Sequence, residues 1–313
     1  MLKKLCSLTL CAAFLLSLTA CSDMDSSEAP PPSPFPVQVK GITLEAQPQR
    51  IVSLSPALTE MVFEIGHGES LIGRSSYCEY PPQVSSVESV GSAAHPDLEA
   101  ITAAAPDLLL TQSPMAKKDI VALENAGIPV CILPSPASLK ELEEAYGTLG
   151  MLLEGIDGDI KGESVFTPIA SAIALTGGSK TDSFVYITSP DFAVATGDTF
   201  ESDILSHFGT NIAQQATGYS FTPEEIVEAD PSIIFLSADV PSETLLSDPV
   251  LSVLSAVQAG RVYTLESRYF ERPTNRLTEL IGQIRSTFAS ISSSSNEPAV
   301  PLETEVEETE TVE

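Results

Sequence analysis

The sequence predicts an α/β protein with two similar lobes, each built on a parallel sheet, joined by a helical middle segment. Short apolar, β-rich runs alternate with helical segments in both halves of the chain, which is the pattern of parallel βα units. The second half also repeats the first, because "EAITAAAPDLLL" from Glu99 and "EEIVEADPSIIF" from Glu224 align without a gap. An offset of 125 residues is too long for a solenoid and indicates two related lobes.

In the first half, "RIVSLS" (50–55) is predicted as a strand. Ser55 is the expected N-cap and Pro56 the first residue of a helix that ends at Gly66. Further strands are predicted in "SLIGRSSY", "PDLLLT" and "IPVCIL", and a helix in "AKKDIVALENAG".

The middle and second half continue with helices and then strands. Ser138 and Glu141 have the spacing of a capping box before apolar residues at helical spacing. "KGESVFTPIASAIAL" also has a helical pattern, although it contains Pro168. The remaining predicted elements are the strand "SFVYIT", the helix "SDILSHFG", the strands "PSIIFLS" and "GRVYTLE", and the amphipathic helix "RLTELIGQIRSTFASI".

The N-terminus has the features of a secretory signal. Lys3 and Lys4 precede an apolar stretch (5–18) that is too short for a comfortable membrane span. Small residues directly precede Cys21, as in the lipobox of bacterial lipoproteins. We therefore expect export, cleavage before Cys21, and lipidation of this residue, which would anchor the protein to the outer face of the cell membrane.

Composition then sets the expected domain boundaries. A segment rich in Pro, Ser and acidic residues follows Cys21, and a Glu-rich tail without Lys or Arg ends the chain, so both are predicted to be disordered. The predicted parts are a signal peptide (1–20), a lipidated tether (21–45), an N-terminal lobe (46–136), a bridging helical segment (137–180), a C-terminal lobe (181–290) and an acidic tail (291–313).

Charge and cysteine content exclude some functions. The formal charge of −28 at pH 7 argues against nucleic acid or an anionic membrane surface as a partner. Only Cys78 and Cys131 lie beyond the signal and the lipobox, and we expect them to be unpaired.

The stretch "SSYCEYPPQ" (75–83) contains Cys78, whose thiol is a candidate nucleophile. Its two prolines exclude a helix and predict a fixed loop. A nucleophilic Cys78 would need an activating base, but no Cys/His protease signature, "GxSxG" or "HExxH" motif is present. The sequence therefore predicts no enzyme and no catalytic residue, and Tyr77 is the residue of this loop expected to contact a ligand.

Few residues could bind a metal directly. The chain has three scattered histidines, and no protein-held metal site or resident cofactor is predicted. His95 differs from the others because it precedes Pro96 at a helix start, where the loops of an open sheet face a crevice. Contact with a ligand and a capping or solvated role are both compatible with this position.

Aromatic residues are concentrated in loops, which suits a cleft for a bulky ligand, although a single loop aromatic more often serves in packing. They are Tyr77, Tyr80, Tyr219, Phe221, Tyr269 and Phe270.

Five motifs resemble one family in the same order. They are "RIVSLSPALTEMVFEIG", "SSYCEYPPQ", "VGSAAHPDLEAITAAAPDLLLT", "GTNIAQQATGY" and "YFERPTNRL". From about Gln49 to Phe288 the chain resembles ABC-transporter substrate-binding proteins of the iron-siderophore, haem and cobalamin cluster, and most of all the cobalamin-binding proteins. The resemblance implies two Rossmann-like lobes bridged by one long helix, a ligand between them, and only a small closure on binding.

The resemblance also implies roles for individual residues. Glu99 and Glu224 would dock onto arginines of the membrane permease, which works together with an ATPase. Arg272, with the two aromatic residues before it, matches a segment that closes the cleft. The predicted ligand-binding residues are Tyr77, His95, Gln112, Tyr219, Tyr269, Phe270 and Arg272.

The resemblance leaves the identity of the ligand open, because the sequence departs from the cobalamin-binding pattern at the cleft residues. Cobalamin binders of this family use cleft tryptophans, whereas this chain has none: Ala93 and Gln112 stand roughly where two would be, and Arg268 replaces an acidic residue. A corrinoid, a haem with His95 or a tyrosine as axial ligand, and a ferric siderophore are the three candidates.

The expected function is thus capture of a metal-chelate nutrient, with corrinoid first, by a monomeric, lipid-anchored binding protein that delivers it to an ABC importer. Two other classes are compatible with the sequence. One is a surface hydrolase or other enzyme on the same scaffold, and the other is a chelate-sensing or adhesive surface lipoprotein.

Overall fold

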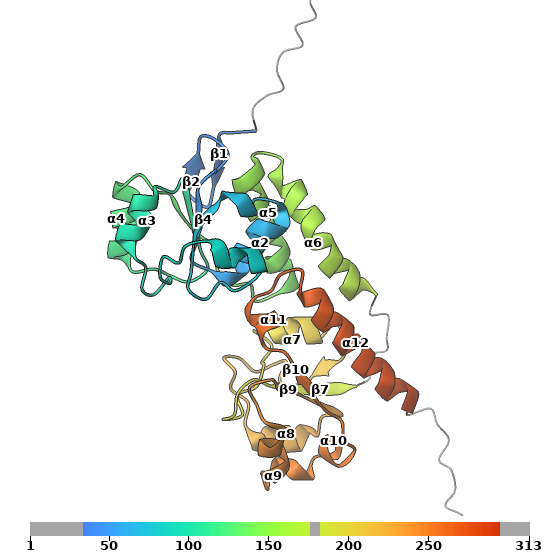
Figure 1. Cartoon of the computed structure of the whole chain (residues 1–313). Coiled ribbons are helices and arrows are strands. Elements are labelled where there is room, and N and C mark those ends of the chain that lie inside the picture. The colour runs from blue at the N-terminus through green and yellow to red at the C-terminus, as the bar shows by residue number, and fades with distance from the viewer. Residues whose placement is uncertain (1–33, 176–181, 295–313) are drawn as a thin grey trace, which may run out of the picture. The chain divides into compact units, whose positions relative to one another are not determined.

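The computed structural model describes residues 34–175 and 182–294, and it contains two four-stranded parallel sheets. Figure 1 shows each sheet with helices packed beside it. The first sheet has the order β4-β3-β5-β6 and the second the order β8-β7-β9-β10. Their strands are β3 (Ile51–Ser53), β4 (Leu71–Arg74), β5 (Leu108–Thr111), β6 (Val130–Ile132), β7 (Ser183–Ile187), β8 (Thr210–Asn211), β9 (Ile233–Ser237) and β10 (Val262–Leu265).

The helices fall between and after these strands. They are α2 (Pro56–Ile65), α3 (Leu98–Ala104), α4 (Lys117–Asn125), α5 (Leu139–Glu154), α6 (Gly158–Ala174), α7 (Phe200–Leu205), α8 (Pro223–Ala229), α9 (Ser242–Ser247), α10 (Ser255–Gln258), α11 (Arg268–Glu271) and α12 (Leu277–Ser294). Among these described helices, none is both long enough and apolar enough to cross a membrane.

The predicted fold class is confirmed, and the internal repeat is visible in the sheets. Each sheet places its first strand between its second and third strands, so the two strand orders are equivalent. Helices α3 and α8 repeat in detail. Their N-caps, Asp97 and Thr222, are 125 residues apart, and both helices end on a residue with positive φ, Ala105 and Asp230.

Local chemistry explains why the predicted helix α2 forms. The Ser55 side chain accepts a hydrogen bond from the backbone of Leu58, and Pro56 occupies the first turn, where its missing N–H costs nothing. Gly66 ends the helix at φ 109°, a conformation that disfavours other residues.

The segment between the sheets consists of α5 and α6, which are packed closely against each other. A Cβ atom added at Gly150 would lie 2.0 Å from the carbonyl oxygen of Gly158, and one added at Gly162 would lie 2.1 Å from that of Tyr146. Only glycine fits at such a contact, so these residues set the separation of the helices. Helix α6 continues through Pro168, as its apolar pattern predicted.

The start of the folded region differs from the expectation. The tether was predicted to extend to residue 45, but β1 (Val37–Val39) and β2 (Ile42–Leu44) form an antiparallel hairpin. Alternate residues of this hairpin are buried in the main core, and Lys40 and Gly41 supply positive φ at its turn. The proline-rich composition before residue 37 hid this short alternating pattern.

The predicted end of the C-terminal lobe and the state of the cysteines can also be compared with the structure. Helix α12 extends to Ser294, four residues beyond the predicted end of the C-terminal lobe. Cys21, the signal peptide and most of the acidic tail lie outside the described residues, so these expectations stay predictions. Cys78 and Cys131 are both free, as expected, and both are buried.

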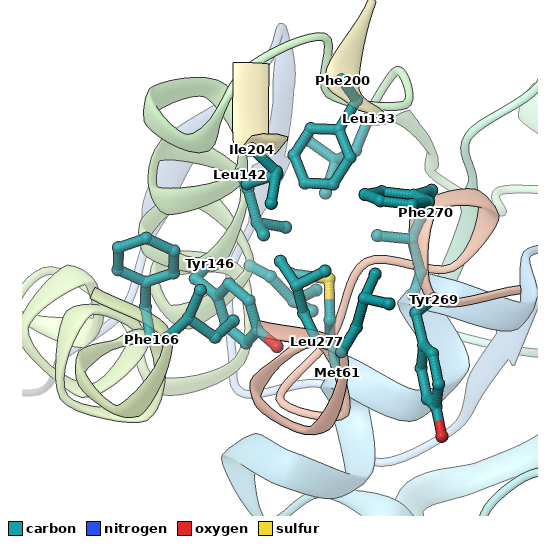
Figure 2. Packing of buried hydrophobic residues seen from close by; sticks show 14 of the residues in the cluster. Met61, Leu133, Leu142, Tyr146, Phe166, Phe200, Ile204, Tyr269, Phe270 and Leu277 are labelled. Carbon is teal, nitrogen blue, oxygen red and sulfur yellow. The ribbon is translucent and has the colours of Figure 1, made fainter. Parts of the chain in front are cut away.

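One apolar core joins elements from both halves of the chain. Figure 2 shows Met61 of α2, Tyr146 of α5 and Phe166 of α6 in the same cluster as Ile204 of α7 and Phe270 of α11. Each half also has a smaller apolar cluster of its own, but these side chains form one continuous cluster that the halves share. Separating them would expose a large apolar surface to water.

Two carboxylates on α2, one buried and one half-buried, reinforce this connection. Glu60, with 1% of its surface exposed, accepts hydrogen bonds from the Thr274 hydroxyl (2.9 Å) and the Arg276 guanidinium (3.2 Å). Glu64, one turn later, accepts hydrogen bonds from the backbone N–H of Asn275 (3.0 Å) and from the hydroxyl of Tyr146. We call these six residues the carboxylate clamp, because they fix the segment before α12 to the first half of the chain.

Burial raises the pKa of both carboxyl groups in the clamp. Desolvation raises the pKa of Glu64 to about 7, against the lowering effect of its hydrogen bonds from Tyr146 and Asn275, and the nearby carboxyl of Glu60 raises it further. Burial also raises the pKa of Glu60, although Thr274 and Arg276 act in the opposite direction. Both carboxyls are therefore easier to protonate than exposed ones.

The raised pKa of Glu64 predicts a pH-dependent stability. The folded state binds the proton more tightly than the unfolded state, so this contribution is full below about pH 4.5 and is lost as the pH rises through about 7. In Glu64→Gln the amide can donate to Tyr146 and its oxygen can accept from Asn275, which mimics the protonated acid. Relative to the wild type, the variant should gain on the order of 1–3 kcal/mol in unfolding free energy between pH 5 and pH 8.

Denaturant unfolding at several pH values measures this difference. Glu144→Gln, which changes an exposed carboxylate on α5, is the control and should follow the wild type at every pH. Parallel curves for the wild type and Glu64→Gln would contradict the prediction.

Candidate ligand-binding cleft

A cleft of about 530 Å³ lies at one edge of the first sheet. Parallel strands end at the same edge, so the loops that follow β3, β4, β5 and β6 meet there, and each contributes to the lining. The segment from Glu271 to Arg272, from the second half of the chain, completes it. We call this site the carboxyl-edge cleft, and its volume is in the usual range for small-molecule sites.

Four of the seven predicted ligand-binding residues line the carboxyl-edge cleft. They are Tyr77 after β4, His95 before α3, Gln112 after β5, and Arg272 after α11. They come from segments that are far apart in the sequence, so the fold brings the predicted residues together. Whether they bind a ligand stays a prediction.

The loop of "SSYCEYPPQ" directs two neighbouring residues to opposite sides. Tyr77 is 63% exposed and faces the cleft, whereas Cys78 is 2% exposed and its sulfur lies 3.2 Å from the Thr59 hydroxyl. Burial raises the pKa of the Cys78 thiol, which disfavours the reactive thiolate. Cys78 therefore packs inside the protein, and its geometry does not suit a nucleophile.

The same loop is held against the segment that leads to α12. The Arg276 guanidinium lies over the Tyr80 ring, 4.4 Å from its centroid, while also binding Glu60 of the carboxylate clamp. Arg272 lies 4.0 Å from Glu79, which is largely exposed. The clamp and the cleft thus share one segment, and the cleft wall that contains Arg272 is fixed by the residues that follow it.

Gln112 is oriented by the cap of α2. Its amide oxygen accepts a hydrogen bond of 2.6 Å from the Ser55 hydroxyl, which itself accepts the backbone N–H of Leu58. Ser55 was predicted only as a helix cap, and its contact with Gln112 was missed. The sequence signal was its place directly after a strand, where side chains reach the edge of the sheet.

A tight turn presents His95 to the cleft. The backbone N–H groups of Ser92 and His95 each donate to the carbonyl oxygen of the other, at 3.1 Å. Gly91 has φ 89°, and a Cβ atom at this position would lie 2.4 Å from the carbonyl oxygen of His95. Only glycine is compatible with this turn, which therefore holds the position of His95 closely.

The other three predicted ligand-binding residues do not line this cleft. Tyr269 is buried and donates a hydrogen bond to Glu279 at 2.8 Å, and Phe270 is buried against Tyr186. Tyr219 is partly exposed in a loop of the second half, with positive φ. Packing accounts for Tyr269 and Phe270 in this structure, and a role for any of the three in binding stays a prediction.

The predicted docking residues occupy equivalent positions. Glu99 and Glu224 lie in the first turns of α3 and α8, and both are exposed. Glu225 instead completes a capping box with Thr222. Exposed carboxylates that are not needed for capping are available to a partner, although no partner is present to test this.

The described residues contain no cluster of three or more His, Cys, Asp or Glu side chains that could hold a metal ion. The charged groups of the carboxyl-edge cleft are equally few. Arg272 and Glu271 line it, and Glu79 lies close to Arg272. The uncharged polar side chains that line it include those of Ser55 and Gln112.

Comparison with known proteins agrees with this architecture. A family described as periplasmic binding protein matches residues 51–269. The chain belongs to this family. The match spans both sheets, from β3 to α11, and confirms the resemblance found in the sequence.

The individual relatives share between 21% and 27% of their aligned residues with this chain. An uncharacterised ABC transporter substrate-binding lipoprotein of Bacillus subtilis is 27% identical over 269 residues, covering 80% of this chain and 84% of the relative. A cobalamin-binding protein of Halobacterium salinarum is 27% identical over 263 residues, covering 79% and 71%. The crystal structure of a vitamin B12-binding protein of Vibrio cholerae aligns with a TM-score of 0.64 and 21% identity, covering 78% of this chain and 98% of that one.

Proposed function

We propose that this periplasmic binding protein captures a corrinoid in the carboxyl-edge cleft and delivers it to an ABC importer. Membership of the family supports a binding protein, and the names of the relatives favour cobalamin and ABC transport. The observation that carries the ligand class is the small number of positive charges in the cleft.

The charge argument separates a corrinoid from haem and from catecholate siderophores. Haem has carboxylate side chains, and catecholate siderophores bind iron as multiply charged anions, so both need cations in a desolvated site. Arg272 is the cation among the cleft residues, Glu271 lines the cleft beside it, and Glu79 lies 4.0 Å from Arg272. A corrinoid has uncharged amide side chains, which suit the serine hydroxyls and the Gln112 amide.

Binding measurements test this proposal. We expect cyanocobalamin to bind at least about 100-fold more tightly than haemin or a ferric catecholate siderophore in equilibrium dialysis. Tighter binding of haemin or the siderophore would contradict the ligand class and leave the family unaffected. Failure of all three to bind would contradict the proposed function and favour an enzyme or a surface sensor on this scaffold.

Export and anchoring are part of the same proposal. The lipobox before Cys21 and the name of the Bacillus subtilis relative both support a lipoprotein held at the outer face of the cell membrane. The hairpin β1–β2 is the first element that the structure describes, and the residues from Cys21 to Ser33 would connect it to the lipid. Such a monomer would deliver its ligand while staying close to the importer.

Docking to the permease would use Glu99 and Glu224. Two matched acidic groups on equivalent helices would fix the register of the protein on a permease with basic loops. We expect Glu99→Arg/Glu224→Arg to abolish uptake of labelled cyanocobalamin by cells and to leave its Kd within about twofold of the wild type.

The matched control is Glu124→Arg/Glu163→Arg, which changes the net charge equally at exposed positions on α4 and α6. It should support normal uptake. Equal loss of uptake in both double variants would show a general charge effect and contradict specific docking.

A further inference from the structure

We propose that the outer face of α6 lies on the membrane to which the protein is anchored, in contact with zwitterionic lipid headgroups. This inference rests on the anchoring part of the proposed function, because it states where the anchored protein touches the lipid. It leaves α3 and α8, the helices proposed for docking, to the permease. We call this surface the outer α6 face, and its exposed residues are Ile160, Ser164, Thr167, Pro168, Ser171 and Leu175.

The geometry of the helix places these residues on one side. Helix α6 contacts α2, α5 and α12, and its Phe166, Ile169 and Ile173 belong to the core that both halves share. Ile160 and Ser171 are about three helical turns apart, so they point in the same direction, away from that core. From Ile160 to Leu175 the face is about 22 Å long.

Aliphatic side chains lie at both ends of the outer α6 face. Ile160 is 65% exposed and Leu175 is 70% exposed, and Ile156, directly before α6, is 61% exposed. Aliphatic residues that are exposed singly are normal, but three along one helix are typical of a contact surface.

The outer α6 face also differs in charge from other exposed helices. The sequence from Ser164 to Leu175 contains no ionisable side chain, although the chain has a formal charge of −28. Exposed carboxylates occur instead on helices such as α4 and α5, at Glu124 and Glu143. The Thr167 hydroxyl already donates to the carbonyl oxygen of Glu163 at 2.9 Å. Contact with lipid therefore requires little desolvation of polar groups.

The charged residues at the N-terminal end of the face favour one type of lipid. Asp157, Lys161 and Glu163 are exposed there. These acids and the net charge of the chain would be repelled by a strongly anionic surface. A zwitterionic surface fits better, because the long side chain of Lys161 can extend to lipid phosphate while Ile160 enters the headgroup region.

The described chain begins at this same end of the face. The backbone N–H of Ile156 donates to the carbonyl oxygen of Pro34 at 2.9 Å, and a Cβ atom at Gly155 would lie 2.3 Å from that oxygen. The 13 residues from Cys21 to Ser33 span at most about 45 Å when fully extended. A lipid on Cys21 would keep this end of the face within that distance of the bilayer, so that a weak contact is favoured by a high effective concentration.

Tryptophan fluorescence tests the proposal, because the chain contains no Trp. The lipidated full chain is reconstituted on phosphatidylcholine vesicles with plain or brominated acyl chains, and bromine quenches the emission of a nearby Trp. Ile160→Trp should lose about half of its emission on the brominated vesicles. Val253→Trp, at a residue of the second half that is 63% exposed, should lose less than about a tenth.

Charge added to the face should remove this contact. In the Ile160→Trp protein, Ser164→Glu/Ser171→Glu should reduce the quenching at least about fivefold, because the carboxylates resist desolvation. The matched control, Thr102→Glu/Ala122→Glu in the same protein, adds equal charge at exposed positions on α3 and α4 and should leave the quenching unchanged. Equal loss in both would show a general charge effect and contradict the proposal.

Flotation of the same vesicles separates this inference from the proposed function. If the protein floats with the vesicles but Ile160→Trp is quenched no more than Val253→Trp, the lipid contact is wrong and anchoring stands. Emission from Ile160→Trp at short wavelength without bromine quenching would indicate that a second copy or another protein covers the face, which also contradicts lipid contact. If the protein does not float, anchoring and lipid contact are both wrong.

Discussion

The carboxylate clamp is the interaction on which the rest of this structure depends. Glu60 and Glu64 on α2 bind Thr274, Asn275 and Arg276, more than 200 residues later in the chain. Breaking one side would leave a buried charge without a partner, which is costly. Because the shared apolar core lies beside the clamp, the two halves meet in a defined register. The segment fixed in this way contains one wall of the carboxyl-edge cleft.

The position of the cleft follows from the parallel sheet. Four strands end at one edge, and their loops supply Tyr77, His95 and Gln112 without any of these residues being near another in sequence. Secondary contacts then orient them: the cap of α2 holds Gln112, and a turn that requires Gly91 holds His95. A preformed site of this kind binds without a large ordering cost.

Much of this could be predicted from sequence because the signals were local. Strong β-rich runs, the cap at Ser55 and the repeat of Glu99 at Glu224 predicted the elements and the two related sheets. The clamp could not be predicted, because two glutamates in an apolar helix do not indicate their distant partners. Tyr269 and Phe270 illustrate the same limit. The sequence does not distinguish an aromatic residue that packs in the core from one that faces a ligand. Proline-rich composition concealed the hairpin β1–β2 for a different reason, since its strands have only three residues each.

The central claim is that the clamp and the shared core hold the cleft in one form before and after ligand capture. Electron spin resonance can measure the distance between labels at Val121→Cys and Val253→Cys, which are exposed on the two halves, while Cys78 and Cys131 are buried. With cyanocobalamin added, the account predicts a change in the mean distance of less than about 2 Å. A closure of several ångströms would contradict it.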